Sequence, residues 1–246
     1  MAREPRHFWF AMKLTIIQTG EVPAPLRDRF VPYPNMFHRM FEQAGHDFSY
    51  ETAAVFDGAP FPDPDALEGI IITGSPAGVY DNHLPWMEPL RAFIRKAYAA
   101  KTPMLGICFG HQIMADALGG DVRKSEKGWG LGRHVYGVGN RPEFVGGTLP
   151  EFAVACSHQD QVIVPPAEAE VFIGSDFTPN AGLVYRNGAA VSLQPHPEFE
   201  DDYTLALAQL RRGKAPDPVV DAALASVSRP SDSREIAGYL GAFLSR

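Results

Sequence analysis

The 246-residue sequence contains only two cysteines, Cys108 and Cys156. Two cysteines cannot form the disulfide framework of a small secreted domain, so we expect a reducing, cytoplasmic environment. The apolar runs are far shorter than the ~20 residues of a membrane-spanning helix, which argues against a membrane protein. Acidic residues outnumber basic ones, 29 to 22, and the formal net charge is −7. Because basic residues form no cluster larger than a pair such as Arg211 and Arg212, we expect no nucleic-acid partner.

Several signatures of cofactor and metal chemistry are also missing. The sequence contains no GxxxxGKS/T phosphate-binding loop and no Ser-Gly-Gly-x-Asp-Ser run of an ATP pyrophosphatase. It has no H-E-x-x-H or C-x-x-C pattern, and His111, His134 and His158 are too widely spaced for a recognisable zinc motif. The sequence therefore predicts no cofactor and no metal. Any reaction should depend on the side chains and backbone of the chain itself.

One stretch has the pattern of a nucleophile elbow. Residues 104–112, MLGICFGHQ, predict a short apolar strand, a sharp turn and the start of a helix. Gly106 and Gly110 lie two residues on either side of Cys108, which is the G-x-S-x-G spacing with Cys in place of Ser. Such a turn places the thiol at a helix N-terminus, where the dipole favours the thiolate. The alternative is a buried, unreactive cysteine, because free cysteines are among the most buried residues.

A candidate base lies in the stretch QPHPE at residues 194–198. Pro197 favours an extended His196, and residues i and i+2 of an extended chain point to the same side. Glu198 can therefore orient the imidazole of His196. Cys108, His196 and Glu198 are thus a candidate nucleophile, base and orienting acid. Taken alone, the stretch fits a proline-stiffened surface loop with a solvated histidine equally well.

These two stretches resemble those of the class I (triad) glutamine amidotransferases. Residues 70–81, IIITGSPAGVYD, resemble the family's oxyanion-strand region, and residues 157–162, SHQDQV, resemble a segment of GMP-synthase-type domains. The four blocks occur in family order and cover roughly residues 12–200. The chain is most similar to stand-alone GMP-synthase-like glutamine amidotransferase domains. The resemblance implies that a Cys108 thiolate attacks the side-chain amide of glutamine. A γ-glutamyl thioester forms, ammonia leaves, and water then releases glutamate.

The elbow geometry and the resemblance together indicate further site residues. The backbone amide of Phe109, next to the nucleophile, should be one donor of the oxyanion hole. The resemblance implies that the amide of Gly74 is the second donor, and that Gln112 helps to hold the α-amino-acid end of the substrate. The substrate would be glutamine or another γ-glutamyl compound. A separate synthase subunit would accept the ammonia, since the sequence shows no second catalytic region.

Two alternatives to this interpretation stay open. The same triad would serve a hydrolase of γ-glutamyl peptides or conjugates, which differs only in its leaving group. The fold would also serve a non-enzymatic regulatory module, although the intact Cys108, His196 and Glu198 weigh against it. A leaving-group pocket near residues 79–81 or Trp129 would distinguish the amidotransferase from the peptide hydrolase.

The patterning predicts an α/β fold with a mostly parallel central sheet and helices on both faces, flavodoxin-like as in class I glutamine amidotransferases. Apolar strands alternate with amphipathic helices up to Gly120, as in βαβ units. From residue 121 to 194 the pattern is β-rich, with a hairpin turn at Asn187 and Gly188. We expect a leader of uncertain structure at residues 1–11, a glutamine amidotransferase-like domain at 12–200, and a helical C-terminal extension at 201–246 packed on the same domain.

Overall fold

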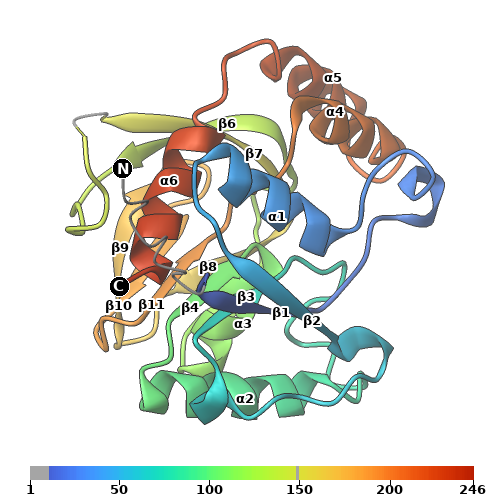
Figure 1. Ribbon diagram of the computed structural model, residues 1–246. Coiled ribbons are helices and arrows are strands. Elements are labelled where there is room, and N and C mark those ends of the chain that lie inside the picture. Colours follow the sequence, from blue (N-terminus) through green and yellow to red (C-terminus); the bar gives the residue numbers. More distant parts are fainter. Residues whose placement is uncertain (1–10, 148–149) are drawn as a thin grey trace, which may run out of the picture.

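A nine-stranded sheet forms the centre of the molecule in the computed structural model (Figure 1). The structure describes residues 11–147 and 150–246, so almost all of the expected leader lies outside the described residues. The strands of this sheet are β1 (Lys13–Gln18), β2 (Ser49–Ala54), β3 (Gly69–Ile72), β4 (Met104–Ile107), β6 (Gly130–Val138), β7 (Glu151–His158), β9 (Ala169–Gly174), β10 (Gly182–Tyr185) and β11 (Ala190–Leu193).

The sheet has a parallel half and an antiparallel half. Its strand order is β2-β1-β3-β4-β11-β10-β9-β6-β7. The strands from β2 to β11 in this order are parallel, and β10, β9, β6 and β7 continue the sheet with antiparallel pairings. All four residues of β3 are buried, as expected for a central parallel strand covered on both faces. The predicted α/β fold class is confirmed.

A separate two-stranded sheet pairs β5 (Asp121–Lys124) with β8 (Asp160–Val164). The sequence predicted β-rich structure from residue 121 onwards but gave no specific signal for β5, and the reason is its composition. Only Val122 of its four residues is buried, so β5 has neither an apolar run nor a clear alternation.

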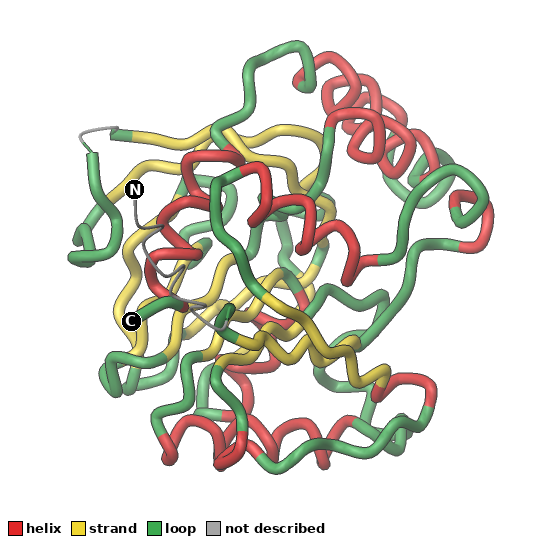
Figure 2. The backbone as a smooth tube through the Cα atoms, in the orientation of Figure 1, coloured by secondary structure: helices red, strands yellow, loops and turns green. Residues whose placement is uncertain are grey.

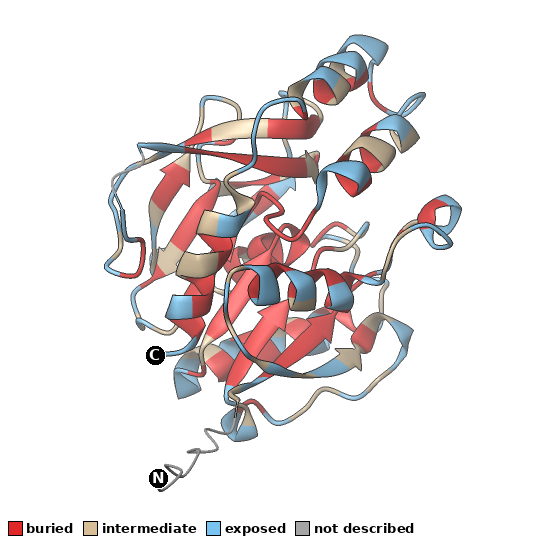
Figure 3. Ribbon diagram, turned by 45° about the horizontal axis from the view of Figure 1, so that its top comes forward, coloured by how far each residue is buried: buried red, intermediate tan, exposed pale blue. Residues whose placement is uncertain are grey.

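Helices cover both faces of the parallel half (Figures 1 and 2). Ile16 of β1 packs in a cluster with residues of α1 and α6, whereas its neighbour Ile17 packs in a cluster with residues of α2 and α3. Successive residues of a strand point to opposite faces, so this alternation buries both sides of the strand. Figure 3 shows the resulting buried centre and the exposed outer faces of the helices. The helices are α1 (Tyr33–Gln43), α2 (Met87–Ala100), α3 (Phe109–Ala117), α4 (Asp201–Leu210), α5 (Asp217–Ser226) and α6 (Ser233–Leu244).

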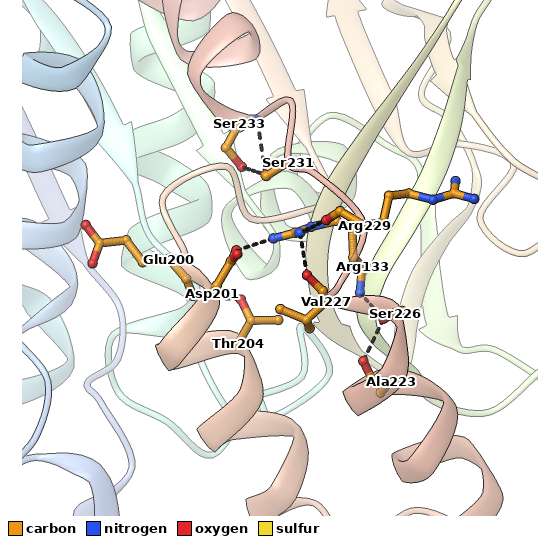
Figure 4. A network of polar contacts seen from close by, with 10 residues as sticks. All are labelled: Arg133, Glu200, Asp201, Thr204, Ala223, Ser226, Val227, Arg229, Ser231 and Ser233. Atoms are coloured by element: carbon orange, nitrogen blue, oxygen red, sulfur yellow. Dashed lines mark hydrogen bonds and ion pairs between the residues drawn. The ribbon is translucent and has the colours of Figure 1, made fainter.

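A buried arginine on β6 makes hydrogen bonds and an ion pair to the C-terminal helical segment (Figure 4). Arg133 of β6 is 4% exposed; it pairs with Asp201 and donates to the carbonyls of Val227, at 2.9 Å, and Arg229. The neighbouring Gly132 allows α5 to approach closely, since a Cβ there would lie 2.5 Å from the carbonyl oxygen of Ala223. These contacts support our proposal that residues 201–246 pack on the same domain. No helix in the described ranges is long and apolar enough to cross a membrane.

Candidate active site

Three neighbouring parallel strands carry the candidate residues to one edge of the sheet. Gly74 follows β3, Cys108 follows β4, and His196 follows β11, and β4 lies between the other two strands. The carboxyl ends of parallel strands meet at the same edge, which is where ligand sites of α/β sheets form. The strand order therefore brings together residues that are more than 120 positions apart in the chain.

Cys108 occupies the tight turn between β4 and α3. Its φ of 54° and ψ of −104° are unusual for a residue with a side chain. The turn requires glycine on both sides. A Cβ on Gly106 would lie 2.6 Å from the carbonyl oxygen of Gly110, and a Cβ on Gly110 would lie 2.2 Å from that of Ile72. Cys108 is 6% exposed and stands at the N-terminus of α3, so it lies at the positive end of the helix dipole.

The imidazole of His196 is held by its surroundings. Its Nδ1 lies 2.7 Å from Oε1 of Glu198, and both side chains are buried. Its ring stacks on Phe199 with a centroid distance of 3.8 Å and an interplanar angle of 8°. The backbone amide of His196 donates to the carbonyl of Ala155 at 2.8 Å. These contacts fix the ring plane and direct Nδ1 to the carboxylate of Glu198, which leaves Nε2 available for proton transfer.

The charge state of His196 follows from two opposing effects. Burial by itself lowers the pKa of His196, because a charged imidazolium loses its hydration. The negative charges of Glu198 and then Cys108 act in the opposite direction and raise this pKa to about 10. The site therefore favours the imidazolium form near neutral pH.

Two backbone amides near Cys108, those of Gly74 and Phe109, have no acceptor among the described residues. Gly74 adjoins both key side chains, since a Cβ built on it would lie 3.1 Å from Cε1 of His196 and 3.8 Å from Cβ of Cys108. Phe109 directly follows Cys108 as the first residue of α3. Across residues 11–147 and 150–246, neither the Gly74 nor the Phe109 amide donates to another group of the protein. Both amides are therefore candidate donors to a ligand oxygen.

Two cavities meet at Cys108. The first has a volume of about 310 Å³ and is lined by Gln112. The second has a volume of about 370 Å³ and is lined by His196. The side-chain amide of Gln112 donates to the backbone carbonyl of Asp160 at 2.9 Å and to Oε1 of Gln194 at 3.2 Å. Tyr80, Asp81 and Trp129 line the first cavity, together with Gln112. The two cavities share Ser75, Pro76, Cys108, Ser157 and Arg211.

His158 lines the first cavity, whereas His111 and Cys156 line neither of the two cavities. His111 is fully buried with Nδ1 2.8 Å from Oγ of Ser192, and burial lowers the pKa values of His111 and His158 to about 3. Among the residues that the structure describes, no group of three or more His, Cys, Asp or Glu side chains could hold a metal ion. Cys156 is buried in β7, and burial raises its pKa to about 12.

Sequence reasoning missed several residues at the site. Phe199, which supports the imidazole ring, directly follows Glu198 and could have been suspected from that position. Tyr33 lines the second cavity, stacks near Phe199, and accepts a hydrogen bond from the Tyr203 hydroxyl at 3.2 Å. No local pattern links Tyr33 to Cys108, because α1 reaches the site only through the folded chain.

Comparisons with known proteins agree on one family. The family model "Glutamine amidotransferase class-I" matches residues 37–203. A putative glutamine amidotransferase of Saccharomyces cerevisiae is 34% identical over 67% of this chain and 67% of its own length. A glutamine-hydrolyzing GMP synthase subunit of Ignicoccus hospitalis is 30% identical over 68% of this chain and 84% of its own. Gamma-glutamyl peptidase 3 of Arabidopsis thaliana is 28% identical over 69% and 70%, respectively.

Other matches show how far the similarity extends. The GMP synthase of Thermus thermophilus is 30% identical, but the match spans only 32% of that longer protein. The crystal structure of a glutamine amidotransferase from Thermotoga maritima has a TM-score of 0.72 over 96% of this chain and 97% of its own. Its sequence identity is 21%, so this likeness shows the fold alone.

Proposed function

Because the chain belongs to the class-I glutamine amidotransferase family, we propose that it hydrolyses the side-chain amide of glutamine with Cys108 as the nucleophile. The observation that carries the proposal is the buried His196–Glu198 pair, 2.7 Å apart, in which His196 lines the same cavity as Cys108. A nucleophile, a base and a group that orients the base are the parts that covalent acyl transfer requires.

The proposed reaction begins with the proton of the Cys108 thiol on His196, in keeping with the raised pKa of this histidine. The sulfur attacks the carbonyl carbon of the γ-amide, and the carbonyl oxygen becomes an oxyanion that accepts from the amides of Gly74 and Phe109. His196 then gives its proton to the leaving nitrogen. The carbon–nitrogen bond breaks, ammonia leaves and a γ-glutamyl thioester remains.

Hydrolysis of the thioester completes the cycle. Neutral His196 takes a proton from water, the resulting hydroxide adds to the thioester carbon, and the oxyanion forms again in the same hole. The carbon–sulfur bond breaks, glutamate leaves, and Cys108 and His196 return to their starting states. The carboxylate of Glu198 orients His196 and stabilises its imidazolium form.

The first cavity is the proposed site of the γ-glutamyl group. Gln112 lines this cavity and holds the carbonyl of Asp160, so it shapes the wall that would meet the α-amino-acid end of the substrate. Lys124 and Asp160 also line it and provide charges of both signs, which suits a substrate end that carries an ammonium and a carboxylate. No cofactor is needed for this chemistry.

Ammonia would pass to a separate synthase subunit. A relative that is itself named as one subunit of a glutamine-hydrolyzing GMP synthase supports this partner. Both cysteines are free, which supports a reducing, cytoplasmic location.

The second cavity favours a second candidate function, hydrolysis of γ-glutamyl peptides. Its volume of about 370 Å³ on the His196 side is far larger than departing ammonia requires. Arg27, Arg211 and Lys214 line it together with Glu21, which pairs with Arg27. The remaining positive charge would attract the carboxylate of a peptide leaving group. A relative named gamma-glutamyl peptidase 3 also supports this candidate.

A substrate screen with two cysteine variants tests both candidates. Glutamate release is measured from glutamine and from γ-glutamyl dipeptides, for the native chain, Cys108→Ala and Cys156→Ala. Cys108→Ala should abolish turnover, and 6-diazo-5-oxo-norleucine should label Cys108 but not the buried Cys156. Turnover by Cys108→Ala would refute the nucleophile assignment. Faster release from dipeptides than from glutamine would select the peptide hydrolase, and no release from any γ-glutamyl compound would favour a regulatory module.

A further inference from the structure

Two buried threonines extend the pairing of β1 and β3 beyond the ends of both strands. Thr19 directly follows β1 and Thr73 directly follows β3; they are 1% and 0% exposed. The amide of Thr73 donates to the carbonyl of Ile17 at 3.2 Å, as in the strand ladder. The amide of Thr19 then donates to Oγ1 of Thr73 at 3.1 Å, so a side chain takes the place of a backbone acceptor.

The two hydroxyls hold the backbone carbonyls on either side of the Gly74 amide. Oγ1 of Thr19 lies 3.0 Å from the carbonyl oxygen of Thr73, and Oγ1 of Thr73 lies 3.1 Å from that of Gly74. Oγ1 of Thr19 is also 3.2 Å from both Oγ1 of Thr73 and the carbonyl of Gly74. Each hydroxyl has a single proton. Both buried carbonyls are satisfied when the Thr19 hydroxyl donates to the carbonyl of Thr73 and the Thr73 hydroxyl donates to the carbonyl of Gly74.

The carbonyl of Thr73 and the amide of Gly74 belong to one peptide group. A trans peptide is planar, and its C=O and N–H point in opposite directions. A hydroxyl that anchors the carbonyl on one side therefore fixes the direction of the amide on the other. Gly74 needs such an anchor, because glycine has no Cβ to restrict rotation of the neighbouring peptides. We infer that Thr19 is a positioning residue, whose hydroxyl keeps the Gly74 amide directed at the oxyanion.

Gly20 restrains the same loop. A Cβ on Gly20 would lie 2.9 Å from Cδ of Pro76 and 3.0 Å from Cα of Ser75, so its backbone packs directly against the loop. The side-chain amide of Gln18 donates to the carbonyl of Gly20 at 2.9 Å. The end of β1 thus forms a rigid support for the segment that carries Gly74. The inference rests on the proposed function, and it adds that the isolated chain keeps its oxyanion hole formed without a partner subunit.

Three threonine variants test the role of the Thr19 hydroxyl. Thr19→Val keeps the shape of the side chain and removes the donor, whereas Thr19→Ser keeps the donor. Thr102→Val is the matched control, because Thr102 is also buried and its hydroxyl donates to a carbonyl, that of Pro64, at 3.1 Å. Thr102 lies just before β4, at the opposite edge of the sheet from Cys108.

Steady-state kinetics of the isolated full chain are measured for each variant with the substrate that the screen identifies. Loss of one oxyanion donor lowers kcat about 10²–10³-fold in other enzymes, so a misdirected donor in Thr19→Val should lower kcat about 10–100-fold. KM should change less than about threefold, because the oxyanion forms only in the transition state. Thr19→Ser should recover at least a third of native kcat, and Thr102→Val should keep native kcat.

The outcomes separate this inference from the proposed function. If Thr19→Val keeps kcat within twofold while Cys108→Ala is inactive, the inference is wrong and the proposed function stands. If Cys108→Ala is active, the proposed function is wrong. Equal losses of kcat in Thr19→Val and Thr102→Val would show a general loss of stability. A loss of kcat in Thr19→Ser as large as in Thr19→Val would show that the hydroxyl of residue 19 is not the cause. Either result overturns the role of Thr19.

Discussion

Replacing Glu198 with Gln would remove the charge beside His196 while keeping the hydrogen-bond acceptor. Oε1 of Glu198 lies 2.7 Å from Nδ1 of His196, and the amide oxygen of Gln can occupy this position. Oε2 of Glu198 is buried and has no hydrogen-bond partner within the described residues, so the new NH2 group breaks no existing contact. The variant therefore tests the charge of Glu198 separately from its geometry.

The rise in the pKa of His196 sets the size of the expected effect. A change from 6.5 to about 10, at about 1.4 kcal/mol per pKa unit, corresponds to about 5 kcal/mol in favour of the imidazolium. Burial opposes this change, and Glu198 is the larger of the two charges that cause it. If about half of this energy is expressed in the transition state, Glu198→Gln should lower kcat about 10²-fold.

The pH dependence gives a second readout with a definite sign. The native chain should keep its imidazolium, and hence its activity, until the pH approaches about 10. Without the Glu198 charge, burial dominates and the alkaline limb of kcat/KM should move to lower pH by more than about one unit.

Glu200→Gln is the matched control for this experiment. Glu200 lies two positions further on, is exposed, and accepts from the side-chain amide of Gln43 at 3.3 Å. This variant should keep the native kcat and the native pH profile. The reasoning is refuted if Glu198→Gln keeps kcat within threefold and its alkaline limb stays in place. It is equally refuted if the two variants behave alike.

Two further predictions concern stability and are measured by denaturant unfolding. Gly110→Ala should lower the free energy of unfolding by about 1–3 kcal/mol or more, because its Cβ would lie 2.2 Å from the carbonyl oxygen of Ile72. The control Gly238→Ala, in α6, should raise it by up to about 1 kcal/mol, because its Cβ would meet nothing within 4 Å. Equal effects of the two variants would contradict the tight packing around Gly110. Arg133→Met should lower the free energy of unfolding by about 2–4 kcal/mol, since two loop carbonyls lose their donor. Asp201→Asn should lower it less, because that carboxylate is 57% exposed. An unchanged stability of Arg133→Met would contradict the role of Arg133 in holding the C-terminal helices to β6.

The parts of this structure that follow from local rules were predictable. The spacing of Gly106, Cys108 and Gly110 predicted a strand, a turn and a helix, and the structure has β4, a residue at φ 54° and α3 in this order. Glu198 lies beside His196 because two positions separate them in an extended stretch, which is also a local rule. The assignment of roles to these residues remains a proposal.

Features that depend on distant parts of the chain were not predictable. The pattern from residue 121 to 194 indicated strands, but the order β10-β9-β6-β7 depends on which apolar faces meet after folding. Tyr33 enters the site from α1, and Thr19 contacts Thr73 across 54 positions. The second cavity was missed for the same reason, because its walls come from the loop after β1, from α1 and from α4.

Two energetically unfavourable features lie at the site, although others, such as the positive φ of Lys101 and the unpartnered Nε2 of His38, lie elsewhere in the described chain. A positive φ at Cys108 costs about 1–3 kcal/mol, and the unpartnered, buried Oε2 of Glu198 costs a similar amount. Both features lie at the carboxyl edge of the parallel strands, next to the α3 helix, in which eight of nine residues are buried. A dense core can hold strained groups in place because it offers them no lower-energy arrangement. A strained residue that also lines two cavities, as Cys108 does, is a candidate for a role in binding or catalysis.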